Sequence, residues 1–355
     1  MVSLQSVKEG GFLTATLDLA LPFEAGKWAL ESGVEFDLSH RGILTITPPK
    51  VSALTKDIIV SAGVHGDETG PIELVQEMAQ SLLLGKLVPA HRLLLIIGHP
   101  QAINVHTRFI EENMNRLFAE RNDETNIDRI NANQLQYAVD DFYQKSPLLT
   151  LHHDQALPDR WHLDLHCAIR DSVHYTFAVS PYSEKTTRSG ALFSFLQQAE
   201  IEAILLSSAP SPTFSWYSAE NYGAQGLTME LGKVARLGEN DLTRLAPFAD
   251  VMQQLVCCET LPVSWDDSAT NVYRVTRSLA KKSDDFSFTF PSNQANFTFF
   301  EHGKLLAQDC GVEYYSLEGG EAVVFPNPNV ALGQRACLLV QQTDVKFGEQ
   351  VTVAK

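Results

Sequence analysis

The sequence predicts an α/β protein with a smaller β domain at its C-terminus, and two patterns carry this prediction. Between about residues 57 and 207, apolar runs such as DIIVSAG and LLLIIG alternate with amphipathic segments, as expected of buried strands joined by helices. Beyond about residue 262 the helical periodicity disappears, and strand-like pieces separated by Gly, Pro and Asn remain. We therefore expect an α/β domain over residues 1–261 and a β domain over 262–355.

The individual elements follow from the period of their apolar residues. Alternation in FLTATLDLAL, VEFDL and GILTITP predicts short strands in a β-rich opening segment within residues 1–50. Apolar residues three and four apart predict helices over 72–85 and 132–144. Buried strands are expected at 57–63, 93–98, 161–166, 175–180 and 203–207.

Composition narrows the functional classes. A chain of 355 residues with 44% apolar and 20% charged side chains can bury a substantial core. The formal charge of −16 argues against a nucleic-acid partner, because phosphate backbones would be repelled. No long apolar span or signal-like N-terminus is visible, and five cysteines without a C-x-x-C pair suggest free thiols. We therefore expect a cytoplasmic protein with no membrane partner.

Three side chains predict one zinc site. His65 and Glu68 follow a buried strand and precede a helix that begins near Pro71, and their spacing lets both side chains converge. His166 ends the strand WHLDLH, and sites in α/β sheets assemble at the carboxyl ends of strands. Catalytic zinc sites typically use three protein ligands and leave a fourth position for water. Asp164 lies on the same strand face and would hold a ligand imidazole through its other nitrogen.

Each of these motifs has an ordinary alternative explanation. An H-x-x-E pair arises by chance, and histidines at strand ends often only satisfy local backbone groups. The glycines at 63, 66 and 70 favour the metal site, because they imply a close-packed turn. His152 and His153 lie on a connector rich in Asp and Pro and are interpreted as surface residues, and His162 as a packing or supporting residue.

A catalytic base and a cluster for binding anions complete the prediction. Glu230 lies in the apolar strand GLTMELGK, where a carboxylate serves either as a base or as a salt-bridge partner of Lys233. Arg108, Asn115 and Arg116 follow the LLLIIG strand and suit an anionic substrate, because arginine binds carboxylates bidentately. The alternative for these arginines is an exposed ion pair with Glu111 or Glu112, which is worth little.

Five ordered blocks resemble one known family. GVHGDETGPIEL, NMNRLF, HLDLHCAIR, LTMELGK and the tail GGEAVVFPNPNVALGQRACLL are similar to motifs of the succinylglutamate desuccinylase and aspartoacylase family, within the zinc carboxypeptidase superfamily. The resemblance implies a three-layer, mixed-sheet catalytic domain and hydrolysis of N2-succinyl-L-glutamate to succinate and glutamate. It places the zinc ligands on His65, Glu68 and His166 and the catalytic glutamate on Glu230.

The resemblance also assigns the remaining polar residues. Arg108 would polarise the scissile carbonyl, and Asn115 with Arg116 would hold a substrate carboxylate. Asn113 stands where the aspartoacylase branch usually has aspartate, so a salt bridge from that position is lost. No substrate-contacting tyrosine of that branch can be assigned here, although Tyr314 and Tyr315 lie in the C-terminal part. These departures favour the desuccinylase branch.

Other functions stay open at this point. The same metal chemistry would serve another N-acyl amino acid, such as N-acetylaspartate, and only the carboxylate pocket would differ. A peptidase is disfavoured by the clustered groups for binding carboxylates. A non-catalytic zinc-binding relative is disfavoured because the base and all three ligands are present. The sequence does not indicate the oligomeric state.

Overall fold

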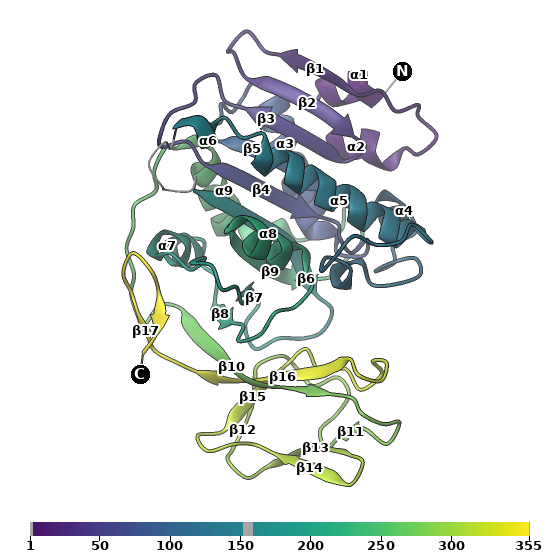
Figure 1. The fold of residues 1–355 in the computed structure, drawn as a ribbon, viewed down its shortest axis with the longest axis vertical. Helices are drawn as coiled ribbons and strands as arrows, with labels where there is room; N and C mark the ends of the chain where they lie inside the picture. Colours follow the sequence, from purple (N-terminus) through teal and green to yellow (C-terminus); the bar gives the residue numbers. More distant parts are fainter. Residues whose placement is uncertain (1–2, 152–158, 355) are drawn as a thin grey trace.

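One mixed sheet runs through most of the residues that the computed structural model describes, which are 3–151 and 159–354 (Figure 1). Its strands are β1 (Gly26–Ala29), β2 (Glu35–His40), β3 (Ile43–Thr47), β4 (Asp57–Ala62), β5 (Arg92–Ile97), β6 (Arg160–Ala168), β7 (Thr176–Ser180), β8 (Ala203–Leu206), β9 (Gln225–Lys233), β10 (Asn271–Ala280), β12 (Thr298–Phe300), β15 (Glu321–Val324) and β16 (Arg335–Gln342). These 13 strands lie in the order β1-β2-β3-β5-β4-β6-β9-β7-β8-β10-β16-β15-β12. The five buried strands expected between residues 57 and 207 are confirmed.

Helices connect the strands of the N-terminal part. They are α1 (Ser3–Lys8), α2 (Phe12–Leu17), α3 (Thr69–Leu83), α4 (Pro100–Asn104), α5 (Ile127–Gln144), α6 (Leu148–Leu151), α7 (Gly190–Gln198), α8 (Phe214–Tyr222) and α9 (Ala246–Cys257). Two short 3-10 helices are η1 (Met114–Arg116) and η2 (Leu242–Leu245). The helices expected at 72–85 and 132–144 correspond to α3 and α5.

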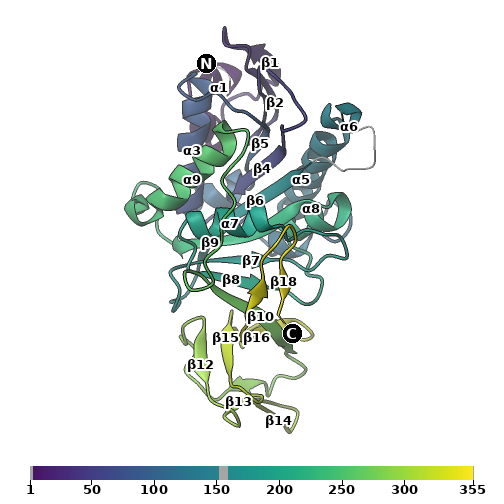
Figure 2. The ribbon, with the colours of Figure 1, turned by 90° about the vertical axis from the view of Figure 1, so that its left-hand side faces the viewer.

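Alternation along the central strands creates three layers. On β6, Trp161, Leu163 and Leu165 join the apolar core formed with α3, α7 and α9. The opposite face packs against α5 and α8 (Figure 2). His162 points to this second side, where its ring contacts Phe214 of α8 edge-on at 4.6 Å. Because successive strand residues point to opposite faces, the polar members of β6 gather on the side of α5 and α8.

The N-terminal segment corrects one expectation. The segment FLTATLDLAL, residues 12–21, was expected to form a strand, but the structure places helix α2 over its first six residues, preceded by α1. Phe12, Ala15 and Thr16 are buried at helical spacing, and the Thr16 hydroxyl donates to the carbonyl oxygen of Phe12 at 2.8 Å. A segment this short fits the period of a helix and that of a strand equally well, and the contacts of α2 with α3 and α4 stabilise the helical form. The expected strands at VEFDL and GILTITP form β2 and β3.

The C-terminal part is built of strands, as expected, and it continues the main sheet. β10 pairs with β8 in parallel, with Asn271 opposite Ala203. The remaining strands are β11 (Ser287–Phe288), β13 (Leu305–Asp309) and β14 (Val312–Tyr315), which form a separate sheet, and the hairpin of β17 (Val345–Lys346) and β18 (Thr352–Val353). The last residues return to the α/β part, where the Val351 amide donates to the Arg188 oxygen at 2.8 Å. The boundary after residue 261 stays a prediction, whereas the predicted fold class is confirmed.

Three further observations concern the whole chain. None of the described helices is both long and apolar enough to cross a membrane. All five cysteines lie within the described ranges, and each carries a free thiol. His152 and His153, expected at the surface, lie outside the described residues.

Candidate metal centre

The loop after β4 carries two of the candidate ligands, and glycines allow its path. Gly63 has a φ of +70°, in the left-handed region that glycine favours. A Cβ atom added at Gly66 would lie 2.2 Å from the carbonyl carbon of Ala102, so only glycine fits there. The Gly66 amide also donates to the backbone oxygen of Arg108 at 3.2 Å. The loop is thus pressed against α4, and it ends at Glu68, the residue directly before α3.

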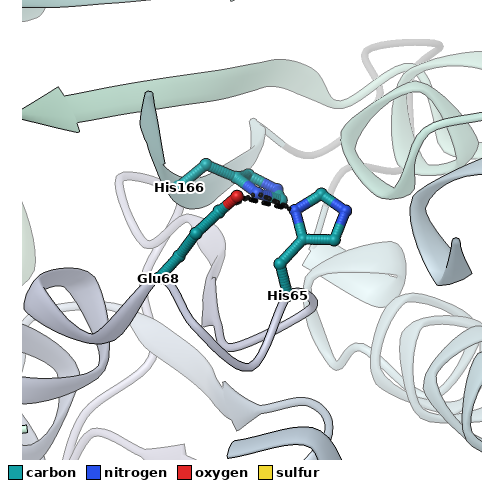
Figure 3. Close-up of side chains that lie close together, drawn as sticks. All are labelled: His65, Glu68 and His166. Atoms are coloured by element: carbon teal, nitrogen blue, oxygen red, sulfur yellow. Dashed lines mark hydrogen bonds and ion pairs between the residues drawn. The ribbon is translucent and has the colours of Figure 1, made fainter. Parts of the chain in front are cut away.

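The structure brings His65, Glu68 and His166 together in a buried space (Figure 3). Nδ1 of His65 lies 3.0 Å from Oε1 of Glu68 and 3.1 Å from Nδ1 of His166. Nδ1 of His166 lies 2.7 Å from Oε2 of Glu68. Among the described residues these three form the one cluster of its kind, with ligand atoms within 4.8 Å of one another. Two imidazole nitrogens and a carboxylate are a donor set for a divalent ion, so the residues present fit a single divalent metal ion.

Both histidines have a hydrogen-bond partner on the ring nitrogen that faces away from the other ligands. Nε2 of His166 lies 2.9 Å from Oδ2 of Asp164, and Nε2 of His65 lies 2.9 Å from Oδ1 of Asn113. The Asn113 oxygen also accepts from the Asn115 amide at 3.0 Å, which fixes the orientation of its side chain. Such partners select the tautomer that leaves Nδ1 free for a metal ion. Sequence reasoning gave Asn113 no role in the site; its only signal was its place in the NMNR motif.

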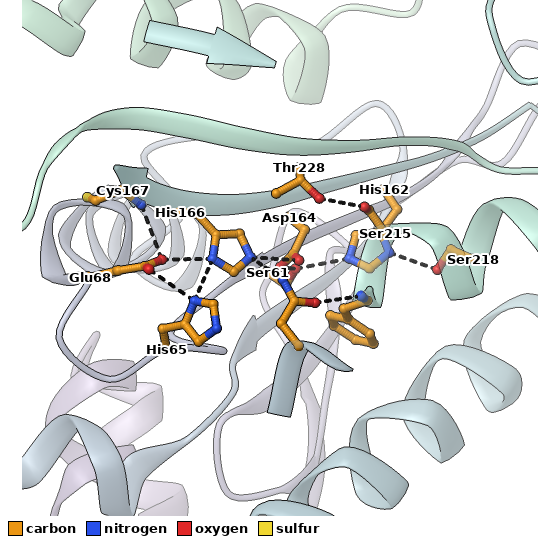
Figure 4. A network of polar contacts seen from close by, with 12 residues as sticks. Ser61, His65, Glu68, His162, Asp164, His166, Cys167, Ser215, Ser218 and Thr228 are labelled. Carbon is orange, nitrogen blue, oxygen red and sulfur yellow. Dashed lines mark hydrogen bonds and ion pairs between the residues drawn. The ribbon is translucent and has the colours of Figure 1, made fainter. Parts of the chain in front are cut away.

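A chain of buried polar groups continues from Asp164 (Figure 4). The Ser61 hydroxyl donates to Oδ1 of Asp164 at 2.7 Å and lies 2.9 Å from Nε2 of His162. Nδ1 of His162 lies 2.7 Å from the Ser218 hydroxyl on α8. Burial lowers the pKa of His162 to about 4, so its ring is neutral near pH 7. A neutral ring that accepts from Ser218 and donates to Ser61 satisfies every member of this chain.

We expect Asp164→Asn to weaken metal binding by roughly 10- to 100-fold, the loss typical for outer partners of metal ligands. Burial would raise the pKa of Asp164, but His166 beside it holds that pKa below its usual range, so the carboxylate is ionised. Asparagine keeps the shape and removes the charge that makes the imidazole basic. Competition with a chromophoric chelator measures the effect. Ser218→Ala, at the far end of the chain, is the matched control, and equal affinities for wild type and Asp164→Asn would contradict the assignment.

Glu230 lies beside His166 on the neighbouring strand. The register of β6 and β9 pairs the two residues, so their side chains share a face of the sheet. Glu230 is buried, at 8% exposure, and forms no hydrogen bond or ion pair with any residue that the structure describes. The alternative partner Lys233 instead pairs with Asp171. Burial raises the pKa of Glu230 to about 7, and the Glu68 carboxylate adds to this shift.

Arg108 reaches the candidate ligands directly. Its guanidinium forms an ion pair with Oε1 of Glu68, and its side chain is 27% exposed. Among the described residues, the alternative ion pairs with Glu111 or Glu112 do not form: Arg108 pairs with Glu68, and Glu112 pairs with Arg129. Arg108 therefore places a partly exposed positive charge directly beside a candidate ligand.

Asn115 and Arg116 lie on η1, next to the same cluster. The Asn115 side chain is buried, its oxygen accepts from the Phe214 amide at 2.9 Å, and its nitrogen lies 3.4 Å from Nε2 of His166. Arg116 is exposed and donates to the backbone oxygen of Asn115 at 2.6 Å. The protein around Arg116 lowers its pKa to about 10, and the nearby charges of Arg335 and Arg108 act in the same direction. Sequence reasoning did not single out Arg335.

The fold and the site together define a class of protein. A buried His-Glu-His cluster lies at the carboxyl ends of sheet strands, beside an unpaired carboxylate with a raised pKa. Such a combination is the arrangement of a metal-dependent hydrolase.

Comparison with known proteins identifies the family. Residues 54–256 match the succinylglutamate desuccinylase/aspartoacylase catalytic domain, and residues 268–343 match the AstE/AspA barrel-sandwich hybrid domain. The chain belongs to the succinylglutamate desuccinylase/aspartoacylase family.

Individual relatives cover nearly the whole chain. The succinylglutamate desuccinylase of Vibrio parahaemolyticus is 46% identical over 97% of this chain and 98% of its own length. A crystal structure of the desuccinylase from that organism superposes with a TM-score of 0.89, at 44% identity and with 97% and 98% of the two chains covered. The desuccinylase structure from Chromobacterium violaceum has a TM-score of 0.80 at 28% identity, with 93% and 97% covered. The similarity thus includes both the α/β part and the C-terminal β part.

Proposed function

We propose that this protein hydrolyses N2-succinyl-L-glutamate to succinate and L-glutamate, with one zinc ion held by His65, Glu68 and His166. The observation that carries the proposal is the buried cluster of these ligands beside Glu230, in a chain 46% identical to a succinylglutamate desuccinylase. The substrate is a small anionic N-acyl amino acid, and no nucleic acid or membrane takes part. A cytoplasmic location stays a prediction.

In this proposal Glu230 is the general base. A zinc ion bound at the site would polarise the amide carbonyl and make a water molecule more acidic. Glu230 accepts the proton of the attacking water and later delivers it to the departing amine of glutamate. A carboxylate with a raised pKa suits both steps, because it is a stronger base than an exposed carboxylate and, once protonated, is still a stronger acid than the ammonium group of the product amine. The C–N bond breaks, and the proton leaves with the amine.

The arginines would bind and orient the substrate. The guanidinium of Arg108 lies beside Glu68, where it can stabilise the negative charge that develops on the carbonyl oxygen. Arg116 forms no ion pair with a described carboxylate, so its charge is available for a carboxylate of the substrate. Asn115 is held by Phe214, and in this proposal it fixes the position of Arg116.

An assay of the zinc-loaded protein tests the function. Release of succinate from N-succinylglutamate should exceed release of acetate from N-acetylaspartate by a large factor, measured as kcat/KM. Faster hydrolysis of N-acetylaspartate would replace the proposed substrate, and no hydrolysis by protein that retains its metal would favour a non-catalytic relative.

Arg116→Ala should raise KM for N-succinylglutamate by roughly 10- to 100-fold and leave kcat nearly unchanged. This split is expected because a carboxylate remote from the reacting bond is bound equally in the ground state and in the transition state. Steady-state kinetics measures it, with Arg116→Lys as the variant that keeps the charge. A fall in kcat at unchanged KM would instead assign Arg116 to the chemical step.

The raised pKa of Glu230 also predicts a pH dependence. A general base works only when it is ionised, so kcat/KM should fall as the pH decreases through the pKa of Glu230. Because burial raises that pKa, the fall should occur at a pH above the usual value of 4.5. The measurement is a pH profile of kcat/KM with the metal content checked at each pH. A flat profile down to 4.5 would contradict this role of Glu230.

A further inference from the structure

A row of side chains leads from the candidate metal centre to the C-terminal β domain. Sheet register places His166 of β6 opposite Glu230 of β9, and Glu230 opposite Phe177 of β7. Residues directly opposite one another point to the same face, so the three side chains lie in sequence across this face. The Phe177 ring contacts that of Phe325, with centroids 5.8 Å apart. The C-terminal domain therefore packs one side chain away from the proposed base.

Arg335 lies at the end of this row. It is the first residue of β16, and its guanidinium carbon lies 5.8 Å from the centroid of the Phe325 ring. Its side chain is half-buried and has no hydrogen bond or ion pair among the described residues. Arg277 of the same domain contrasts with it, because its guanidinium pairs with Glu321 at 2.7 Å. A half-buried guanidinium without an acidic partner is costly unless a ligand supplies the negative charge.

A second guanidinium without an acidic partner among the described residues is that of Arg116, next to the candidate metal centre. Arg116 has no carboxylate partner within the described ranges; the surrounding protein lowers its pKa, and the positive charge of Arg335 adds to this shift. The fold thus leaves two guanidinium groups without an acidic partner in the described part of a chain of net charge −16, although acidic residues are abundant. Partly buried charges without a partner destabilise the folded state, and a bound anion would offset this cost.

We infer that Arg335 binds one carboxylate of the substrate, so that the C-terminal domain contributes a specificity-determining residue to the site. The inference rests on the proposed function, whose substrate carries a succinyl carboxylate and the α- and γ-carboxylates of glutamate. Arginine is suited to this task because its planar donors match a carboxylate and its charge persists at every working pH. Phe325 keeps the guanidinium in place by contact with its ring face.

The test compares zinc-loaded wild type, Arg335→Gln and Arg335→Lys on substrates that lack one carboxylate each. These are N-butyrylglutamate, N-succinyl-4-aminobutyrate and N-succinylglutamine, beside the parent N-succinylglutamate. Arg335→Gln should lower kcat/KM for the parent by roughly 10- to 100-fold, mainly through KM. It should leave kcat/KM unchanged for the analogue that lacks the bound carboxylate, and Arg335→Lys should recover part of the loss. Arg274→Gln, an exposed arginine on β10, is the matched control.

A purely structural role would give a different result, namely an equal loss on all four substrates. That outcome, or unchanged kinetics on all four, overturns the inference. Calorimetry adds a measurement that needs no turnover: N-succinylglutamate is titrated into the Glu230→Gln protein with and without Arg335→Gln. If wild type fails to hydrolyse the parent but binding depends on Arg335, the proposed function fails and the inference stands. Binding that is absent, or that is independent of Arg335, overturns the inference.

Discussion

Glu230→Gln should lower kcat for N-succinylglutamate by roughly 100- to 10,000-fold while the metal ion stays bound, because general base catalysis contributes about this much. Glutamine preserves the size of the side chain but cannot accept a proton. Glu230 has no hydrogen-bond or ion-pair partner among the described residues, so the substitution breaks no contact that holds the fold together. Metal analysis and thermal unfolding should therefore match those of wild type.

Two comparisons make this result specific. Lys233→Ala, three residues beyond Glu230 on β9, alters only an exposed ion pair with Asp171 and should leave kcat near the wild-type value. Glu230→Gln with turnover within about tenfold of wild type, and with metal bound, would require another group to act as base.

The central sheet could be predicted from the sequence because its strands are short, apolar and bounded by turn residues. The structure of residues 12–21 could not be predicted, since the six residues of α2 satisfy helical and strand periods alike. The pairing of β10 with β8 could not be predicted either. Which strands pair across a long stretch of chain depends on tertiary packing and not on the local sequence pattern. Local periodicity therefore predicts elements better than it predicts which elements meet.

Some residues of the candidate site could be predicted from the sequence, and others could not. His65 and Glu68 are close in sequence, and His166 ends a buried strand, so their chemistry stands out against apolar neighbours. Ser61 and Asn113 did not stand out, because a hydroxyl or an amide is ordinary in a strand or a loop. Their roles depend on distances of 2.7 Å to Asp164 and 2.9 Å to His65, which only the folded chain defines.

The position of Arg335 depends even more on the fold. Its neighbours in the sequence, GQRACLL, contain no pattern of a binding site. Only the packing of Phe325 against Phe177 brings it toward the row that contains Glu230. Residues that a second domain contributes to a site are the hardest to predict, because neither their spacing nor their surroundings in the chain reflect the contact.

His166→Ala should abolish measurable hydrolysis and weaken metal binding by more than the roughly 100-fold expected for an outer partner. Two protein ligands would remain of the three that catalytic zinc sites typically use. Metal content after dialysis and turnover at saturating substrate measure the two effects. His302→Ala, which removes an exposed histidine of the C-terminal domain, controls for the substitution itself. Full retention of metal by His166→Ala would remove this residue from the ligand set.

The same variant should also destabilise the chelator-treated protein by about 3–5 kcal/mol, because it removes one partner of a buried charge pair. Burial alone would raise the pKa of Asp164 and lower that of His166. The opposite charges of the two groups outweigh this effect, so that the pKa of Asp164 is lowered and the pKa of His166 is raised. Because its pKa is lowered, the Asp164 carboxyl stabilises the folded state above the unfolded pKa of 3.8. Because its pKa is raised, the His166 imidazole stabilises the folded state below the unfolded pKa of 6.5.

The stability difference between wild type and His166→Ala should therefore be largest between pH 3.8 and 6.5. It should shrink as the pH falls through the folded pKa of Asp164, which becomes protonated, and as the pH rises through the folded pKa of His166, which becomes neutral. Urea unfolding at about pH 5 and about pH 3 tests the acid side of this window. A difference that is the same at both pH values would show that the loss comes from packing around the imidazole and not from its charge.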